Sequence, residues 1–507
     1  MISLSLVTVL LNSTSSKWQT ATWDDYLAYR DHPSLERVKL FYQEGKQVIA
    51  FCLGDHGKYE QIEYSMALSG LPIILLEQTL EQLTELDNGL AAIWFNQQIF
   101  EPKCQRSLLA LFIAGLCFWT SITTLLPTLP LYIESLGGTT QQIGWVMGAF
   151  ALGLLPSRFW FGPLADRKSR KLVLLIGTIV GTMAPLGYLF AESIPSLLSL
   201  RAFHGISVAA FTIGYSALVA DIAPVERRGE VIGYMSLVAP IGMAIGPAVG
   251  GEMQAMVGYD PIFLSSSGFA FLAFLGICQV WEPQHNKPTT KADSTSLLEK
   301  GLWFFKTLWS PPLRIPAFVL LMVGLIFGTL VTFLPLAVKE SGLDFNAGLF
   351  YSTAAIASFL IRIPTGRASD RHGRGLFITG GLICYFLAML LLSQTMHSNI
   401  ILLAALLEGM GAGVVLPMMI TLITDRCLPE QRGQFFSLCL TGFDLGIALA
   451  GPIFGIFAEQ LGYSVMFALD AGLALIALIS FATFSNKTIR LSLKFAFGQS
   501  KDIYSLN

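Results

Sequence analysis

Four ionisable residues stand inside long apolar stretches of the chain, where a charge is costly. They are Arg201 and His204 in residues 195–220, Glu408 in residues 399–424 and Asp444 in residues 433–458. We expect these four residues to serve proton coupling or to line a substrate cavity.

Asp444 is the best candidate for a group that alternately holds and releases a proton. It lies about eleven residues inside its stretch, and an Arg that approaches in one state would drive the proton off. The alternative is a static tie between Asp444 and an Arg or Tyr of a neighbouring helix. Arg158 and Arg362 stand near stretch ends, where they can snorkel, and Asp470 is expected to reach the outer interface.

A charged motif occurs twice, 204 residues apart. Its copies are Arg158-x-x-x-Gly162-x-x-x-Asp166-Arg167, with Arg170 after it, and Arg362-x-x-x-Gly366-x-x-x-Asp370-Arg371, with Arg374 after it. Asp221, Arg228 and Gly229 recur at the same offset as Asp425, Arg432 and Gly433. Each motif carboxylate can pair with the Arg that follows it or face a helix N-terminus. The alternative is that the bases only set topology.

A glycine motif lies in residues 230–256. Gly242, Gly246 and Gly250 share one helix face and allow close backbone packing, and Pro247 permits a bend beside Gly251. The second half repeats the pattern at Gly451 and Pro452. The motif therefore predicts a packing hinge, marking either transport direction or duplicated architecture.

The elements that must position these residues cross a membrane. Among 507 residues, 53% are hydrophobic and 13% are charged, and the mean hydropathy is +0.61. Soluble proteins carry about 25% charged residues. The 32 basic and 34 acidic residues leave no electrostatic footprint for nucleic acid. Composition thus excludes a soluble, fibrous or nucleic-acid-binding chain.

Twelve stretches are long and apolar enough to span the roughly 30 Å hydrocarbon core. They are residues 107–133, 141–162, 171–191, 195–220, 230–256, 261–282, 313–338, 346–366, 375–395, 399–424, 433–458 and 463–484. The one longer break, at 283–312, divides them six and six. The repeats on either side predict two related bundles rocking around a midplane site.

Basic residues orient these spans. The loops on the side of residues 163–170, together with the C-terminal tail, hold 20 Lys and Arg, whereas the opposite loops hold Lys339 alone. Basic loops stay cytoplasmic, so both termini and the 283–312 loop are expected there. Within that loop, Lys300–Trp309 is expected to form an interfacial helix.

The repeated charged loop, the twelve spans and the internal duplication resemble the major facilitator superfamily over residues 107–485. The resemblance implies that the charged loops latch the outward-open state; the latch residues are Gly162, Asp166, Arg167, Arg170, Gly366, Asp370, Arg371 and Arg374. Leu197-x-x-x-Arg201 is similar to a fourth-helix motif implicated in proton coupling, with His204 where Gln is usual. The glycine motif is similar to that of proton-coupled exporters.

Residues 1–104 differ in character from the rest. They hold 7 basic and 13 acidic residues. Thr22–Ala28 predicts a capped helix, Val38–Tyr42 and Gln47–Phe51 a β-hairpin, and Leu71–Ile99 an amphipathic helix. The amino-acid sequences at the two ends of this segment resemble a restriction-endonuclease-like family of the PD-(D/E)xK superfamily. Its catalytic middle is missing, so we interpret the segment as a truncated, inactive remnant.

The predicted fold is therefore an all-α polytopic membrane protein, with twelve transmembrane helices in two six-helix bundles and a small α+β cytoplasmic N-terminal segment. The expected divisions are residues 1–104 for the remnant, 105–282 and 313–485 for the bundles, 283–312 for the central loop and 486–507 for a cytoplasmic tail. The location is the plasma (inner) membrane.

The predicted function is secondary transport: proton-coupled export of a small organic molecule by alternating access. A proton-coupled importer of sugars or metabolites is the alternative. Two hypotheses from other functional classes are a membrane-tethered nuclease and a membrane-integral enzyme.

The aromatic residues Trp119, Phe211, Tyr215 and Phe443 suit either an amphipathic solute or packing. Seven scattered Cys form no Cys-x-x-Cys pair, and no nucleotide-binding loop occurs. We expect no cofactor, metal, nucleic acid or enzymatic activity; the partners are the substrate, protons and the lipid bilayer, and the chain is a monomer.

Overall fold

The computed structural model describes residues 37–43, 47–53, 102–224, 228–283, 309–394, 397–427 and 432–505. The chain divides into two compact units, residues 1–78 and residues 79–507. Three predicted helices lie outside the described residues: Thr22–Ala28, Leu71–Ile99 and Lys300–Trp309. Of the last, only Trp309 is described.

The first unit contains the predicted hairpin. Strand β1 (Arg37–Gln43) pairs antiparallel with β2 (Gln47–Leu53), so that Arg37 lies opposite Leu53 and Gln43 opposite Gln47. This confirms the hairpin, while the remnant interpretation stays a prediction.

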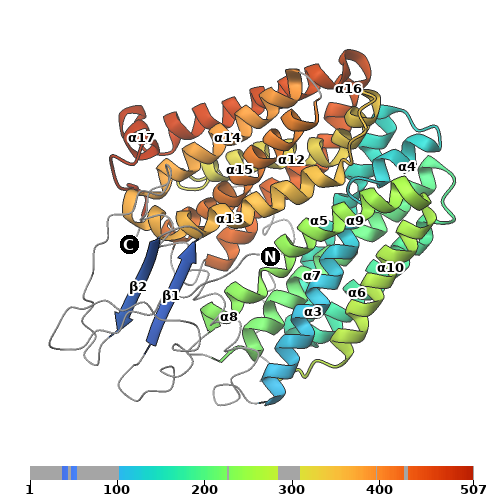
Figure 1. The fold of residues 1–507 in the computed structure, drawn as a ribbon, viewed down its shortest axis with the longest axis horizontal. Helices are drawn as coiled ribbons and strands as arrows, with labels where there is room; N and C mark the ends of the chain where they lie inside the picture. The colour runs from blue at the N-terminus through green and yellow to red at the C-terminus, as the bar shows by residue number, and fades with distance from the viewer. Residues whose placement is uncertain are drawn as a thin grey trace. The chain divides into compact units, whose positions relative to one another are not determined.

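In the second unit, the described residues from Pro102 to Ser505 form helices and their connections. The first group of helices is α3 (Pro102–Thr124), α4 (Leu129–Ser135), α5 (Thr140–Arg167), α6 (Arg170–Tyr188), α7 (Ile194–Ile222), α8 (Arg228–Met235), α9 (Val238–Val257) and α10 (Asp260–Cys278). The second group is α12 (Arg314–Glu340), α13 (Gly348–His372), α14 (Arg374–Gln394), α15 (Ser398–Asp425), α16 (Arg432–Phe484) and α17 (Ile489–Ala496). Figure 1 shows the two groups side by side.

Nine helical segments within the described residues are long and apolar enough to cross a membrane. Helices α5 and α13 are not among them, although they have 28 and 25 residues, because charged and polar residues interrupt their apolar runs. The all-helical membrane architecture is therefore confirmed, and the count of twelve remains a prediction.

Helix α16 covers two predicted spans. It runs for 53 residues, and its backbone leaves helical geometry at Gly462, where φ is +80°. Only glycine adopts that conformation without strain, so Gly462 marks the turn between the spans predicted at 433–458 and 463–484.

The two groups contact each other mainly through two pairs of helices, with smaller contacts of α12 to α4 and α5. Helix α5 packs on α16, and α9 packs on α13. Within the groups, α9 packs on α3 and α16 packs on α12. The same contacts thus occur in both halves of the repeat, and each cross-group contact joins a helix that carries a charged loop to one that carries a glycine motif.

Candidate functional site

An ion pair joins the two groups of helices. Arg158 of α5 contacts the carboxylate of Asp444 on α16, and their side chains are 25% and 13% exposed. Asp444 therefore has an Arg partner, as its sequence position suggested. The partner is Arg158, which the sequence analysis placed near the end of its apolar stretch. The two residues meet because α5 packs against α16.

Arg201 and His204 lie together within the first group. Arg201 is buried, and its guanidinium carbon lies 4.5 Å from the centre of the Phe150 ring. His204 is fully buried, with its Nδ1 3.3 Å from the Tyr188 hydroxyl. Arg201 Nε and His204 Nε2 have no hydrogen-bond partner among the described residues. These groups form a polar cluster between α5, α6 and α7.

Glu408 is buried at the corresponding place in the second group. It stands 204 residues after His204, on α15, within electrostatic range of Tyr351 on α13 and Tyr385 on α14. The Tyr351 hydroxyl donates a hydrogen bond to the carbonyl of Leu330, at 2.9 Å. His204 beside Tyr188 and Glu408 near Tyr351 and Tyr385 therefore stand at equivalent positions of the repeat.

Two of the candidate cavity aromatics are packing residues. Phe211 is fully buried and stacks on Phe118 with ring centres 3.8 Å apart. Tyr215 stacks beside Phe211 and donates a hydrogen bond to the carbonyl of Met235, at 3.1 Å. Trp119 and Phe443 are only partly buried.

The groups meet closely at the helix ends away from the basic loops, which we call the opposite end. Gly144 of α5 lies directly against the backbone of Gly451 on α16. Gly348 of α13 lies in the same way against the carbonyl of Pro247 on α9. Gly348 stands 204 residues after Gly144, and Gly451 stands 205 residues after Gly246, the neighbour of Pro247, so the two contacts lie at corresponding places in the repeat. Side chains are excluded from both crossings.

A second layer of paired contacts reinforces this closure. Gly148 packs against the carbonyl of Ala448 and the ring of Pro452. Its equivalent, Ser352, donates a hydrogen bond to the carbonyl of Ala244, at 2.6 Å.

Polar groups at the ends of these helices also join the groups. The backbone N–H of Gln141 donates to Glu459, at 3.0 Å, and Lys339 Nζ lies 2.8 Å from the carboxylate of Glu134. Lys339 is the single base in the loops at this end, and it binds the other group.

The glycine motif serves both kinds of contact. Gly242, Gly246 and Gly250 face α3, where Trp119, Thr123 and Thr124 lie against them. Thr123 Oγ1 donates to the carbonyl of Gly242, at 2.9 Å. Gly251 faces Asn346, which precedes α13 in the other group. One face of α9 is thus fixed within its group, and the other crosses to α13.

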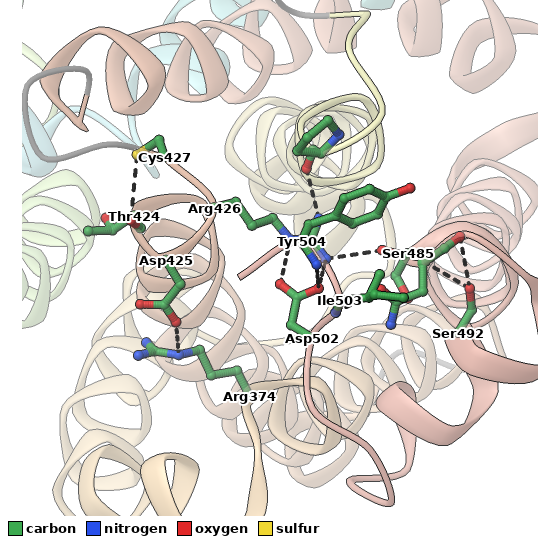
Figure 2. Close-up of polar contacts among 12 residues, drawn as sticks. Arg374, Thr424, Asp425, Arg426, Cys427, Ser485, Ser492, Asp502, Ile503 and Tyr504 are labelled. Carbon is green, nitrogen blue, oxygen red and sulfur yellow. Dashed lines mark hydrogen bonds and ion pairs between the residues drawn. The ribbon is translucent and has the colours of Figure 1, made fainter. Parts of the chain in front are cut away.

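At the basic end, the arginines bind acids of their own group. Arg170 contacts Asp221, and Arg374 Nε lies 2.7 Å from Asp425 (Figure 2). Asp166 is exposed, and Gly162 and Gly366 have open space around them. The motif arginines therefore bind acids at the ends of α7 and α15. Arg167 and Arg371 are exposed; the side chain of Asp370 lies outside the described residues.

Glu282 is a residue that the sequence analysis missed. Its carboxylate accepts hydrogen bonds from Ser169 Oγ at 2.5 Å and from the backbone N–H of Arg170 at 2.6 Å. Lys171 Nζ donates to the carbonyls of Cys278 and Val280. A carboxylate at a helix N-terminus is stabilised by the helix dipole, so the charged loop is fixed to the end of α10. The recurrence of Asp221 and Asp425 was a usable signal for the arginine partners.

Asp470 corrects a sequence-based expectation. It is fully buried rather than at the outer interface, and it faces Thr329 of α12. Neither carboxylate oxygen has a well-formed hydrogen bond among the described residues. The Thr329 hydroxyl donates its proton to the carbonyl of Leu325, at 2.9 Å. No group of three or more His, Cys, Asp or Glu suited to a metal occurs within the described part of the chain.

Comparison with known proteins assigns this architecture. The sequence model described as Major Facilitator Superfamily matches residues 111–427 and 347–496. The chain belongs to the major facilitator superfamily. Members of this superfamily are transporters, so the chain is a multi-pass secondary transporter and not an enzyme.

Relatives within the superfamily include the multidrug resistance protein MdtG of Proteus mirabilis, 30% identical over 72% of this chain and 92% of the relative. MdtG of Serratia proteamaculans is 29% identical over 73% and 92%.

Solved structures of superfamily transporters share the fold. The nucleoside transporter NupG has a TM-score of 0.64 and 15% identity, over 74% of this chain and 99% of that chain. A bacterial homologue of the human lysosomal transporter Spinster, inward-facing and unoccupied, has a TM-score of 0.60 and 17% identity, over 79% and 93%.

Proposed function

We propose that this transporter exports a small organic molecule in exchange for protons, by alternating access between two six-helix bundles. The support for export is that the relatives named above are multidrug resistance proteins, matched over nearly their whole length. The glycine motif adds no support for direction, because both halves use it for the same contacts.

The proposal includes twelve spans in the plasma (inner) membrane. Helices α5 and α13, and the two parts of α16 on either side of Gly462, complete the set. The excess of Lys and Arg in the loops at the basic end favours a cytoplasmic location for that end and for both termini. The closed opposite end is then extracellular, and the described conformation is inward-facing.

The observation that carries the proposal is the Arg158–Asp444 pair between the bundles. A charged pair shielded from water holds together only while both partners are ionised. A proton on Asp444 would remove the attraction and leave α16 free to move against α5. Because Asp444 is paired while the extracellular side is closed, the inward-facing state is the one that has released its proton. That order is the one that exchange of protons for an outgoing substrate requires.

Arg201, His204 and Glu408 are assigned a second role in this scheme. They lie inside the bundles beside aromatic side chains, so they respond to changes in bundle shape and not to separation of the bundles. We assign the coupling step to Asp444 and the shaping of the substrate cavity to these three residues.

The test is uptake of fluorescent organic cations into inverted membrane vesicles with an imposed pH gradient, acid inside. The wild type should accumulate substrate, since inverted vesicles reverse export into uptake. Asp444→Asn should lose gradient-driven uptake by roughly tenfold or more while keeping downhill flux, because an amide cannot carry the proton. The matched control is Asp344→Asn, an exposed carboxylate on the opposite side.

Two outcomes would overturn the proposal. Gradient-driven uptake that survives in Asp444→Asn would exclude this residue from coupling. Accumulation only in right-side-out vesicles, with acid outside, would favour the importer.

A further inference from the structure

Helix α17 is a complete, capped helix at the end of the chain. The Thr488 hydroxyl oxygen accepts a hydrogen bond from the backbone N–H of Leu491, at 3.3 Å. At the other end Gly498 has φ of +70°, and the N–H of Gln499 donates to the carbonyl of Lys494, at 2.7 Å. Both termini therefore satisfy backbone groups that water would otherwise have to satisfy.

One face of α17 is buried against the second bundle. Phe495 packs beside Phe481 of α16, with ring centres 6.0 Å apart. Thr379 of α14 donates a hydrogen bond to the carbonyl of Ala496, at 2.9 Å, and Gly375 lies directly against the carbonyl of Phe495. The rotation of the helix about its own axis is therefore determined.

Arg426 fixes the chain that follows α17. Its side chain is fully buried, with Nε 2.7 Å and Nη2 3.1 Å from the two carboxylate oxygens of Asp502 (Figure 2). It also donates to the carbonyls of Pro312 at 2.7 Å and Ser485 at 3.0 Å. One guanidinium thus joins the tail to the ends of α12, α15 and α16.

The other face of α17 is apolar and exposed. Ile489, Leu493 and Phe497 follow one another at four-residue intervals and are 56%, 40% and 55% exposed. Arg490 and Lys494 lie next to this stripe on the side away from the buried face, and both are exposed. Lys487 and Lys501 flank the helix, and residues 486–501 contain no acid. The exposed face therefore combines an apolar stripe with a row of positive charge.

We propose that α17 is a docking site for anionic phospholipid headgroups of the cytoplasmic leaflet, an inference that rests on the cytoplasmic placement proposed above. The apolar stripe would enter the headgroup–acyl boundary, and Arg490 and Lys494 would bind headgroup phosphates. Charge complementarity selects anionic lipid as the occupant. Because Arg426 holds the tail to three helix ends, the bound lipid sets the depth of the second bundle in the inner leaflet.

The experiment places a nitroxide label at Leu493→Cys in the full chain, with the native cysteines replaced by Ser, in nanodiscs of phosphatidylcholine with or without phosphatidylglycerol. We expect oxygen access to the label to rise, and access of a water-soluble nickel chelate to fall, when phosphatidylglycerol is present. The double substitution Arg490→Gln with Lys494→Gln should lower the apparent affinity of the helix for phosphatidylglycerol roughly thirtyfold, because each lost charge is worth about 1 kcal/mol. Lys103→Gln with Arg106→Gln removes equal charge at the start of α3 and should leave the response unchanged.

A label that stays equally open to the chelate in both lipid mixtures overturns the docking site. Labelling of Leu493→Cys in intact cells by a reagent that does not cross membranes would instead show that the tail lies outside. That result would refute the proposed topology and, with it, the cytoplasmic docking site. Since Leu493 is exposed, the substitution itself should not impair folding.

Discussion

Glu134 and Lys339 occupy equivalent places in the two halves of the chain and face each other across the bundle interface. They are 205 residues apart, and Lys339 Nζ lies 2.8 Å from Glu134 Oε2. Each follows a Pro-Leu pair by three residues, Pro130-Leu131 in one half and Pro335-Leu336 in the other. A duplicated sequence related by an approximate two-fold axis brings equivalent positions together, so opposite charges there favour closure.

The first prediction concerns this pair. Lys339→Glu should open the opposite end, because two carboxylates would face each other. The side chains are 57% and 39% exposed, so solvent screening limits the pair to at most about 1 kcal/mol, or a population change of about fivefold. Spin-label distances between α4 and α12 would measure it. The swap of Glu134→Lys with Lys339→Glu should restore closure, and high salt should reduce the difference; failure of the swap to restore closure would contradict the pairing.

A methyl group at Gly144 should prevent the opposite end from closing. In Gly144→Ala the new Cβ would meet the Gly451 backbone, which cannot move aside as a flexible side chain could. We expect a cost of about 1–3 kcal/mol to the state closed at the opposite end, and transport slowed roughly tenfold. The measurements are transport rate and spin-label distances between α5 and α16.

The control for this substitution is Gly268→Ala, on α10. A Cβ there has open space, so expression and transport should be unchanged. Equal effects of the two alanines would mean that helix propensity, and not the crossing, controls the equilibrium.

Asp470→Asn should stabilise the protein. The carboxylate of Asp470 is fully buried without a well-formed hydrogen bond in the described structure, while the Thr329 hydroxyl already donates elsewhere. An amide can donate to that hydroxyl oxygen and carries no charge. We expect a gain of about 1–3 kcal/mol, seen as a higher unfolding temperature in detergent. Asp470→Ala should gain less, because it leaves a cavity; a lower unfolding temperature for Asn than for Ala would contradict this assignment.

The charged loop should stabilise the conformation that is closed at the basic end. Asp166 is exposed in this structure, so Asp166→Asn should leave folding intact. We expect it to weaken the state closed at the basic end by about 1–3 kcal/mol, which changes a two-state population tenfold or more. Cysteine accessibility at the basic ends of α5 and α16 would measure this, and Arg170→Lys should fall between wild type and Asp166→Asn.

The variant Asp221→Asn serves as a comparison that distinguishes an effect on the latch from an effect on protein stability. It removes the acid that Arg170 binds here, so it should lower the unfolding temperature as well. Unchanged accessibility in Asp166→Asn, at normal expression, would leave the loop with a role in topology alone.

The sequence alone determined the class of protein, the helical elements and the duplication. Spanning helices need long apolar runs, and a charge inside such a run costs enough that Arg201, His204, Glu408 and Asp444 were identifiable from their positions. The hairpin of β1 and β2 was also readable, because strand alternation and a short polar turn are local signals.

Only the tertiary structure decided which residues meet. Asp444 binds Arg158, Arg170 binds Asp221, and Lys339 binds Glu134, each across a long separation in sequence. The burial of Asp470 against α12 belongs to the same class. An apolar run specifies that a helix crosses the bilayer, but not its rotation or its neighbour. Those are set by where glycines let two backbones approach, as Gly144 and Gly451 do, and that choice depends on both helices at once.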